Sequence, residues 1–292
     1  MALELNIISF IGLLLFSRGS TFGRMKYFLI QAVASGRFLW RALLFLREYS
    51  RQGALFFIVL TLLVKLGSAP VHWWFIGILA DLRWDKIFVL STLQKVLPLM
   101  AIRVAGGFKF QGLVVLACFV RVGGSWSLIF LKQIIGYSSI FMLGWVFRVV
   151  KRFFSWITYL RIYSISLFIP VLFFYRLNMN NLMELRDKSF SIKRKVALFF
   201  TIINMGGVPP LFGFWGKVVI LAKLGKEEEI FLSLVLLLAS VFITYLYARV
   251  ALLSLFKSTS SLELKGSWKE KGLLGAGVGL LRLRVRRTVL FV

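Results

Sequence analysis

The chain has 292 residues, of which 59% are hydrophobic and only 16% charged, and its mean hydropathy is +0.85. A soluble domain carries about 45–50% apolar and roughly 25% charged residues, so this composition excludes an ordinary soluble domain. The 37 Lys and Arg residues against 11 Asp and Glu give a net charge of +26, but no soluble domain remains that would bind nucleic acid.

Apolar blocks separated by short connections follow one another along the chain, and each is about as long as a helix that crosses the hydrocarbon core. Strand-length alternation is missing. The blocks predict an all-α, polytopic membrane protein with about ten transmembrane helices. The predicted spans lie near 3–16, 25–47, 54–66 (continuing with a break through 80), 87–103, 111–121, 126–136, 138–150, 155–175, 195–224 (interrupted) and 230–256.

The spans form one predicted transmembrane domain over residues 1–256, and residues 257–292 form a basic C-terminal tail with at most one weak further helix. The basic residues outside the spans gather in short clusters, such as Arg148 to Arg152 and the longest polar loop, Arg176 to Lys195. Such clusters orient a protein in the membrane and bind anionic phospholipid head groups.

Two apolar blocks are broken in the same way. Lys65 is followed by GSAP, and Lys217 is preceded by GGVPP. A helix break at membrane depth is tolerated only inside protein or beside water. A pair of broken helices in the two halves of a chain is typical of an inverted-repeat transporter, although two kinked packing helices would give the same pattern.

Single lysines interrupt several apolar blocks, at positions 65, 95, 132 and 217. A charge at the centre of a bilayer costs at least ~2.5–3.5 kcal/mol on insertion scales. Each of these lysines is therefore expected either to have a function or to extend its ammonium to the membrane–water interface. Glu4 begins the first apolar block and is a possible ion-pair partner. The alternative is that some of the lysines lie at span ends and reach the head-group region.

A buried lysine with a movable partner can gain and lose a proton, because loss of water disfavours the ammonium and a nearby carboxylate favours it. A row of such lysines would form a proton relay. His72 is the only histidine and a possible further member, or else it makes a structural hydrogen bond in the broken helix. With one histidine and one cysteine, Cys118, we expect no metal site and no cofactor in this chain.

Five stretches carry a resemblance to a known family: KYFLIQAVAS (26–35), KLGSAPVHWW (65–74), STLQKVLPL (91–99), LKQIIGYSSIFMLGW (131–145) and GGVPPLFGFWGK (206–217). In order and approximate spacing they resemble subunit 2 of mitochondrial NADH:ubiquinone oxidoreductase (complex I), of the antiporter-like proton-pumping family. The most specific stretch is GGVPPLFGFWGK. The resemblance covers residues 1 to about 256 and implies an antiporter-like inverted-repeat bundle.

By this resemblance, Glu4 is the channel glutamate, Lys65 and Lys95 are the lysines of the first half-channel, and Lys217 is the lysine of the second half. The intervening station departs from the family. Aligned from Tyr137, Gln133 takes the relay position and Lys132 the outer basic one. Either the relay has shifted by one residue or this station is lost.

The resemblance implies a proton-translocating subunit of the inner mitochondrial membrane, with NADH, FMN, iron–sulfur clusters and ubiquinone held by partner subunits. The partners expected are other membrane-arm subunits and anionic phospholipids. Relatives carry another span before the glutamate helix, so we also expect a neighbouring subunit or fragment to cover the N-terminal helix. Two alternatives remain: a stand-alone cation/proton antiporter, and a membrane scaffold that has lost transport.

Overall fold

The computed structural model describes residue 12 and residues 21–46, 51–105, 110–125, 130–187, 190–209, 211–225 and 230–255. All of them belong to one compact unit, Met1–Lys257. The first predicted span with Glu4, and the predicted basic tail 257–292, lie outside the described residues except for residue 12.

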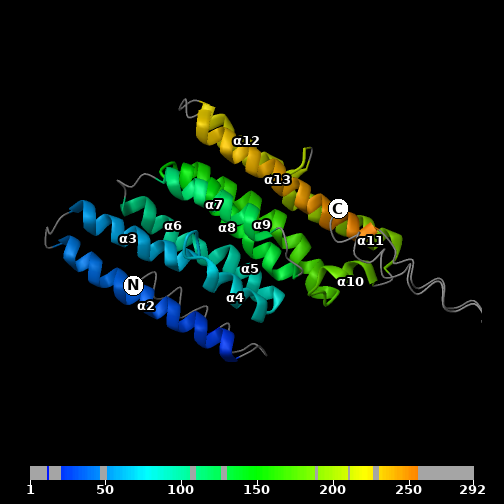
Figure 1. Cartoon of the computed structure of the whole chain (residues 1–292), viewed down its shortest axis with the longest axis horizontal. Helices are drawn as coiled ribbons and strands as arrows, with labels where there is room; N and C mark the ends of the chain where they lie inside the picture. Colours follow the sequence, from blue (N-terminus) through cyan, green and yellow to red (C-terminus); the bar gives the residue numbers. More distant parts are fainter. Residues whose placement is uncertain are drawn as a thin grey trace, which may run out of the picture. The chain divides into compact units, whose positions relative to one another are not determined.

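Helices make up nearly all of the described part of the chain (Figure 1). It contains an isolated bridge between Phe130 and Asn181 and no named strand. The helices are α2 (Thr21–Leu46), α3 (Arg51–Leu66), α4 (Trp73–Asp81), α5 (Trp84–Ser91), α6 (Leu93–Ala105), α7 (Gln111–Ser125), α8 (Leu131–Val149), α9 (Phe153–Arg176), α10 (Leu182–Asp187), α11 (Ile192–Gly206), α12 (Phe212–Gly225) and α13 (Ile230–Leu255).

Helix α8 is the centre of this unit. Most of its residues are buried, and it contacts α7, α9, α4, α5 and α12. Helices α2 and α3 pack together on one side of the bundle, and α11 packs on α13 on the other, as Figure 1 shows. The first half of the described chain therefore meets the second half at α8.

One prediction about the spans is wrong. The stretches 126–136 and 138–150 were expected to be separate, yet α8 runs unbroken from Leu131 to Val149. Gly136, the last residue of the first expected stretch, lies inside the helix, where a Cβ atom would come within 2.6 Å of Leu79 Cδ1. Gly136 therefore permits close packing of α4 against α8 instead of ending a span. The loop expected between Arg176 and Lys195 also contains a short helix, α10.

Three described helical stretches are long and apolar enough to cross a membrane: Trp84–Ala105, which combines α5 and α6, then Phe154–Arg176 and Ile230–Leu255. Leu55–Leu66 and Gln111–Gly124 are shorter apolar helices. The other helices are shortened by breaks or carry interior charges, so the number of about ten spans stays a prediction.

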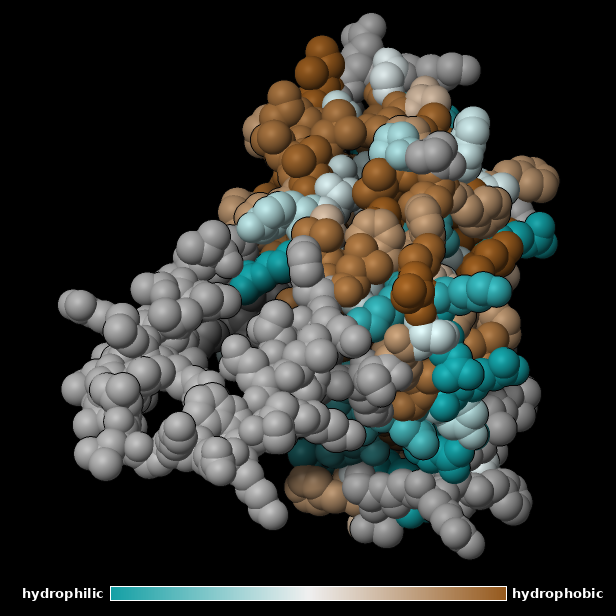
Figure 2. All heavy atoms as spheres, turned by 90° about the vertical axis from the view of Figure 1, so that its right-hand side faces the viewer, coloured by the Kyte–Doolittle hydropathy of each residue, from teal (hydrophilic) through white to brown (hydrophobic). Residues whose placement is uncertain are grey.

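Large apolar side chains are exposed on many helices, among them Leu43 on α2, Phe119 on α7, Phe168 on α9 and Val241 on α13. Figure 2 shows apolar residues over much of the upper part of the described face, with hydrophilic residues gathered in its lower part. Soluble monomers rarely expose apolar area on this scale, whereas lipid covers it without cost. The chain therefore has the surface of an all-α membrane protein.

Candidate functional site: buried lysines beside two broken helices

Both predicted breaks are present, and each contains a glycine in the left-handed region of backbone conformation. At the first, α3 ends at Leu66 and Gly67 has φ 62°. The Gly67 N–H donates to Val64 O at 3.1 Å, and the N–H and hydroxyl of Ser68 each donate to Leu63 O at 3.2 Å. A Cβ atom on Gly67 would lie 2.7 Å from Phe75 Cβ, so this turn requires glycine for both conformation and space.

The second break joins α11 to α12. Helix α11 ends at Gly206, and Gly207 caps it with φ 68° while donating to Asn204 O at 3.1 Å. The side chain of Asn204 spans the gap, because its Oδ1 accepts a hydrogen bond from Gly213 N at 2.9 Å. One freed N–H on each side of the break is thereby paired inside the protein, which satisfies a requirement of the membrane interior.

Lys217 lies on α12 and reaches back across this break. Its Nζ donates to Gly206 O, the last carbonyl of α11, at 2.6 Å, and the side chain is 8% exposed. The C-terminus of a helix carries partial negative charge, which stabilises an ammonium there. A Cβ atom on Gly207 would lie only 2.8 Å from Lys217 Nζ, so the same glycine that forms the turn makes room for the lysine.

Lys95 lies on α6 and is 1% exposed. Its Nζ donates to the carbonyl of Ser139 at 3.0 Å and to the Ser139 hydroxyl. It also lies 5.0 Å from the ring centroid of Phe75, which follows the first break. A lysine of the first half of the chain is thus bonded to the middle of α8.

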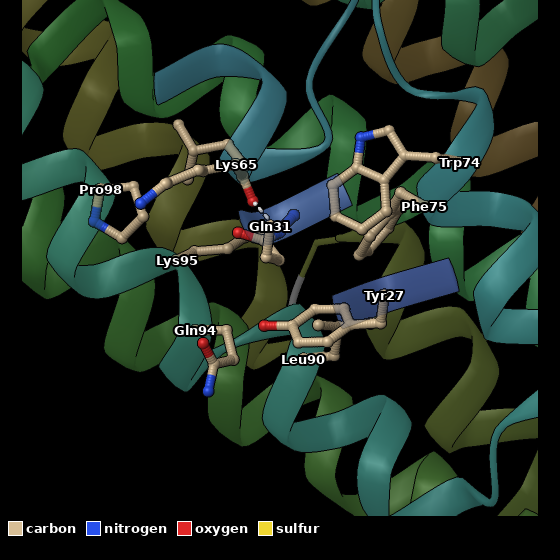
Figure 3. A pocket seen from close by; sticks show the side chains of 10 residues that line it. Tyr27, Gln31, Lys65, Trp74, Phe75, Leu90, Gln94, Lys95 and Pro98 are labelled. Carbon is tan, nitrogen blue, oxygen red and sulfur yellow. Dashed lines mark hydrogen bonds between the residues drawn. The ribbon is translucent and has the colours of Figure 1, made fainter. Parts of the chain in front are cut away.

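Lys65 lies at the end of α3 and is 7% exposed, with Nζ 5.9 Å from the Phe38 ring centroid. Its carbonyl accepts a hydrogen bond from Gln31 Nε2 at 3.3 Å. Lys65 and Lys95 line one small cavity, of about 10 Å³, together with residues of α2, α4 and α5 (Figure 3). This volume is close to the smallest that one water molecule occupies, so the first two lysines share space for about one water.

Three other predicted site residues, His72, Lys132 and Gln133, do not line this cavity. His72 is half-buried at the start of α4, with Nδ1 3.0 Å from Pro70 O and its ring 6.2 Å from that of Tyr137. Lys132 is half-buried, and its Nζ donates to Ala80 O at 3.4 Å, in the last turn of α4. Gln133 is half-buried on α8. The structure therefore brings Lys65 and Lys95 together but leaves Lys132 at a helix end.

Sequence reasoning missed a fully buried arginine. Arg121 on α7 is 0% exposed, its Nη1 donates to Ile134 O at 2.9 Å, and its guanidinium lies 5.3 Å from the Tyr247 ring centroid. The signal was present in the sequence, because Arg121 interrupts the apolar run LACFVRV. Its carbonyl partner is the residue directly after Gln133, so a fixed positive charge lies at the backbone next to the irregular station.

A second cavity, of about 40 Å³, lies between α8, α9, α11, α12 and α13. Lys217 lines it together with Ser138, Tyr163 and Tyr247. Neither tyrosine was selected from the sequence. A tyrosine in an apolar block is indistinguishable from a packing residue until the helices facing it are known.

An apolar helical bundle with two broken helices and lysines buried beside the breaks defines an antiporter-like membrane protein. Residues 1–244 match the family described as "NADH:quinone oxidoreductase/Mrp antiporter, TM". Because this match covers most of the chain, the chain belongs to that family.

Curated relatives agree with this assignment. The chain is 29% identical over 269 residues to NADH-ubiquinone oxidoreductase chain 2 of Anopheles gambiae, a match that covers 86% of this chain and 77% of the relative. It is also 29% identical over 293 residues to the protein of the same name from Myxine glutinosa, covering 92% of this chain and 82% of the relative.

Solved structures share the fold. A chain of respiratory complex I from Thermus thermophilus aligns with a TM-score of 0.68 at 21% identity, over 82% of this chain and 60% of that one. A chain of the Mrp complex from Dietzia aligns with a TM-score of 0.67 at 16% identity, over 81% of this chain and 51% of that one. The chain thus spans less than two thirds of either neighbour, and these likenesses concern the fold alone.

Proposed function

We propose that this chain is a core membrane-arm subunit of respiratory complex I that translocates protons across the inner mitochondrial membrane through buried lysines. The family assignment and the animal relatives named chain 2 support membership of that enzyme. The observation that carries proton translocation is the burial of Lys95 and Lys217, each with its ammonium on a backbone carbonyl, in the middle of α8 for Lys95 and at the second break for Lys217.

The relay begins with a switchable ion pair between Glu4 and Lys65. An opposite charge at ~4 Å contributes about 4 kcal/mol at an effective dielectric constant of 20. At 1.36 kcal/mol per factor of ten, making or breaking such a contact changes the ratio of charged to neutral lysine by about a thousandfold. That is enough to load or unload a proton.

Lys95 responds next, because it shares a cavity with Lys65. Each change of charge at Lys65 is felt at Lys95 across space for about one water. The relay then passes α8, near Lys132 and Gln133, and ends at Lys217. His72, at the start of α4 with its ring 6.2 Å from the ring of Tyr137 on α8, is a further candidate member of the relay.

Electron transfer belongs to other chains in this proposal. NADH, FMN, the iron–sulfur clusters and ubiquinone are held by partner subunits, and this chain is coupled to them by conformation or charge. Its contacts are other membrane-arm subunits, a neighbouring subunit or fragment against the N-terminal helix, and anionic phospholipids beside exposed cations such as Lys151 and Arg152.

The test is a blue-native separation of gently solubilised membranes, with in-gel NADH dehydrogenase staining and mass spectrometry for this chain. We expect the chain in the large NADH-oxidising band. If it runs only in a small band without dehydrogenase activity, it is no subunit of that enzyme. A stand-alone cation/proton antiporter would then be favoured, a function compatible with the fold shared with the Mrp complex.

A further inference from the structure

Lys95 contacts α8 at Ser139, and the cavity that Lys217 lines reaches α8 at the neighbouring residue, Ser138. Lys95 Nζ donates to the carbonyl and hydroxyl of Ser139. Lys217 lines the second cavity, and so does Ser138, the preceding residue on α8. Two lysines from different halves of the chain are therefore separated by a short distance along one helix, and neither needs Lys132 or Gln133 to reach it.

Hydroxyl groups fill the interval between the two lysines. Ser138 Oγ lies 3.3 Å from the hydroxyl of Tyr163 on α9. Ser138, Tyr163 and Tyr247 of α13 line the same cavity. A hydroxyl both donates and accepts hydrogen bonds, so these groups can pass a proton onward, which a backbone carbonyl or an apolar side chain cannot.

The last interval, to Lys217, crosses the second cavity. Tyr247 is 3% exposed, and its hydroxyl has no hydrogen-bond partner among the described residues although it lines this cavity. A buried hydroxyl without a protein partner is normally satisfied by water. The cavity volume, about 40 Å³, exceeds what one water molecule needs, so the cavity has room for water between the tyrosines and the ammonium.

Arg121 lies close to one residue of this cavity. Its guanidinium is 5.3 Å from the centroid of the Tyr247 ring, and Tyr247 lines the cavity. A fixed positive charge disfavours a second one beside it. Positive charge therefore rests on the lysines at the two ends of the path and not on groups within the cavity.

We propose that protons pass from Lys95 to Lys217 through the adjacent hydroxyls of Ser139 and Ser138, then Tyr163 and water in the cavity beside Tyr247, bypassing Gln133. In each transfer a hydroxyl oxygen accepts a proton from the Lys95 side and releases its own toward Lys217, so no proton is gained or lost along the path. The proposal rests on the proposed function and supplies the connection that the irregular station at Gln133 leaves open.

The test compares proton yield per NADH oxidised in the intact enzyme, reconstituted in vesicles, for Tyr163→Phe and for the double variant Tyr163→Phe/Tyr247→Phe. Phenylalanine keeps the ring and removes the hydroxyl. Tyr245→Phe is the matched control, because Tyr245 is on the same helix as Tyr247 but is 54% exposed on the outer surface. Lys217→Met serves as the reference for a fully interrupted relay.

We expect the double variant to lose as much proton yield as Lys217→Met, because both interrupt one path, while Tyr245→Phe keeps the full yield. Electron transfer and assembly serve as the check for structural damage, since a merely structural change lowers both without altering the ratio. A full yield in the double variant beside a reduced yield in Lys217→Met would overturn the route but keep the proposed function. A full yield in Lys217→Met as well would overturn both.

Discussion

Replacing Gly207 by alanine perturbs the second break without changing any charge. Gly207 has φ 68°, which costs an L-residue about 1–2 kcal/mol. The new Cβ atom would lie 2.8 Å from Lys217 Nζ and 2.9 Å from its Cε. These distances are too short for a real contact, so the end of the Lys217 side chain must shift, and we expect it to leave Gly206 O. Losing a hydrogen bond from a charged donor costs a further 1.5–3 kcal/mol, roughly.

The two costs add to about 2.5–5 kcal/mol, which we expect as a lower thermal midpoint of the detergent-solubilised enzyme and a lower proton yield per NADH. The control is Gly77→Ala on α4, where nothing lies within 4 Å of the added Cβ atom and φ is not positive. It should be neutral or stabilising by about 0.5–1 kcal/mol. If Gly207→Ala matched Gly77→Ala in both measurements, the assigned coupling between the turn and Lys217 would be wrong.

Two further variants test other parts of the site. Asn204→Ala leaves Gly213 N without its acceptor across the second break, which should cost about 1–3 kcal/mol and lower the thermal midpoint; an unchanged midpoint would show that the amide is satisfied in another way. Lys132→Met should reduce proton yield less than Lys95→Met does, because Lys132 lies half-buried at the start of α8 and Lys95 is 1% exposed. Equal losses would restore Lys132 to the centre of the relay.

Local signals in the sequence were sufficient to predict the positions of the two breaks and the burial of the lysines beside or between them. Glycine and proline act on the backbone where they occur, so GSAP after Lys65 and GGVPP before Lys217 mark the breaks directly. A lysine within an apolar block is costly wherever that block packs, and Lys65, Lys95 and Lys217 are all buried.

Features that depend on packing between helices were not predictable in this way. The expected boundary between 136 and 138 falls inside α8, where Gly136 allows the contact of α8 with Leu79 of α4. The buried guanidinium of Arg121 contacts a carbonyl of α8 and a ring of α13, and the hydroxyl of Tyr163 is hydrogen-bonded to a serine of α8. None of these partners lies near in the sequence, so no local pattern records them. The roles of Glu4, Lys132, Gln133 and His72 stay predictions.

Proton transfer through the buried lysines is tested most directly by the ratio of protons pumped to NADH oxidised in vesicles containing the intact enzyme. Lys95→Met and Lys217→Met are compared with Lys151→Met, whose lysine is exposed between α8 and α9. We predict that both buried-lysine variants assemble and pump fewer protons per NADH, by the same amount, while Lys151→Met keeps the full ratio. An unchanged ratio in both buried-lysine variants would contradict proton translocation by this chain.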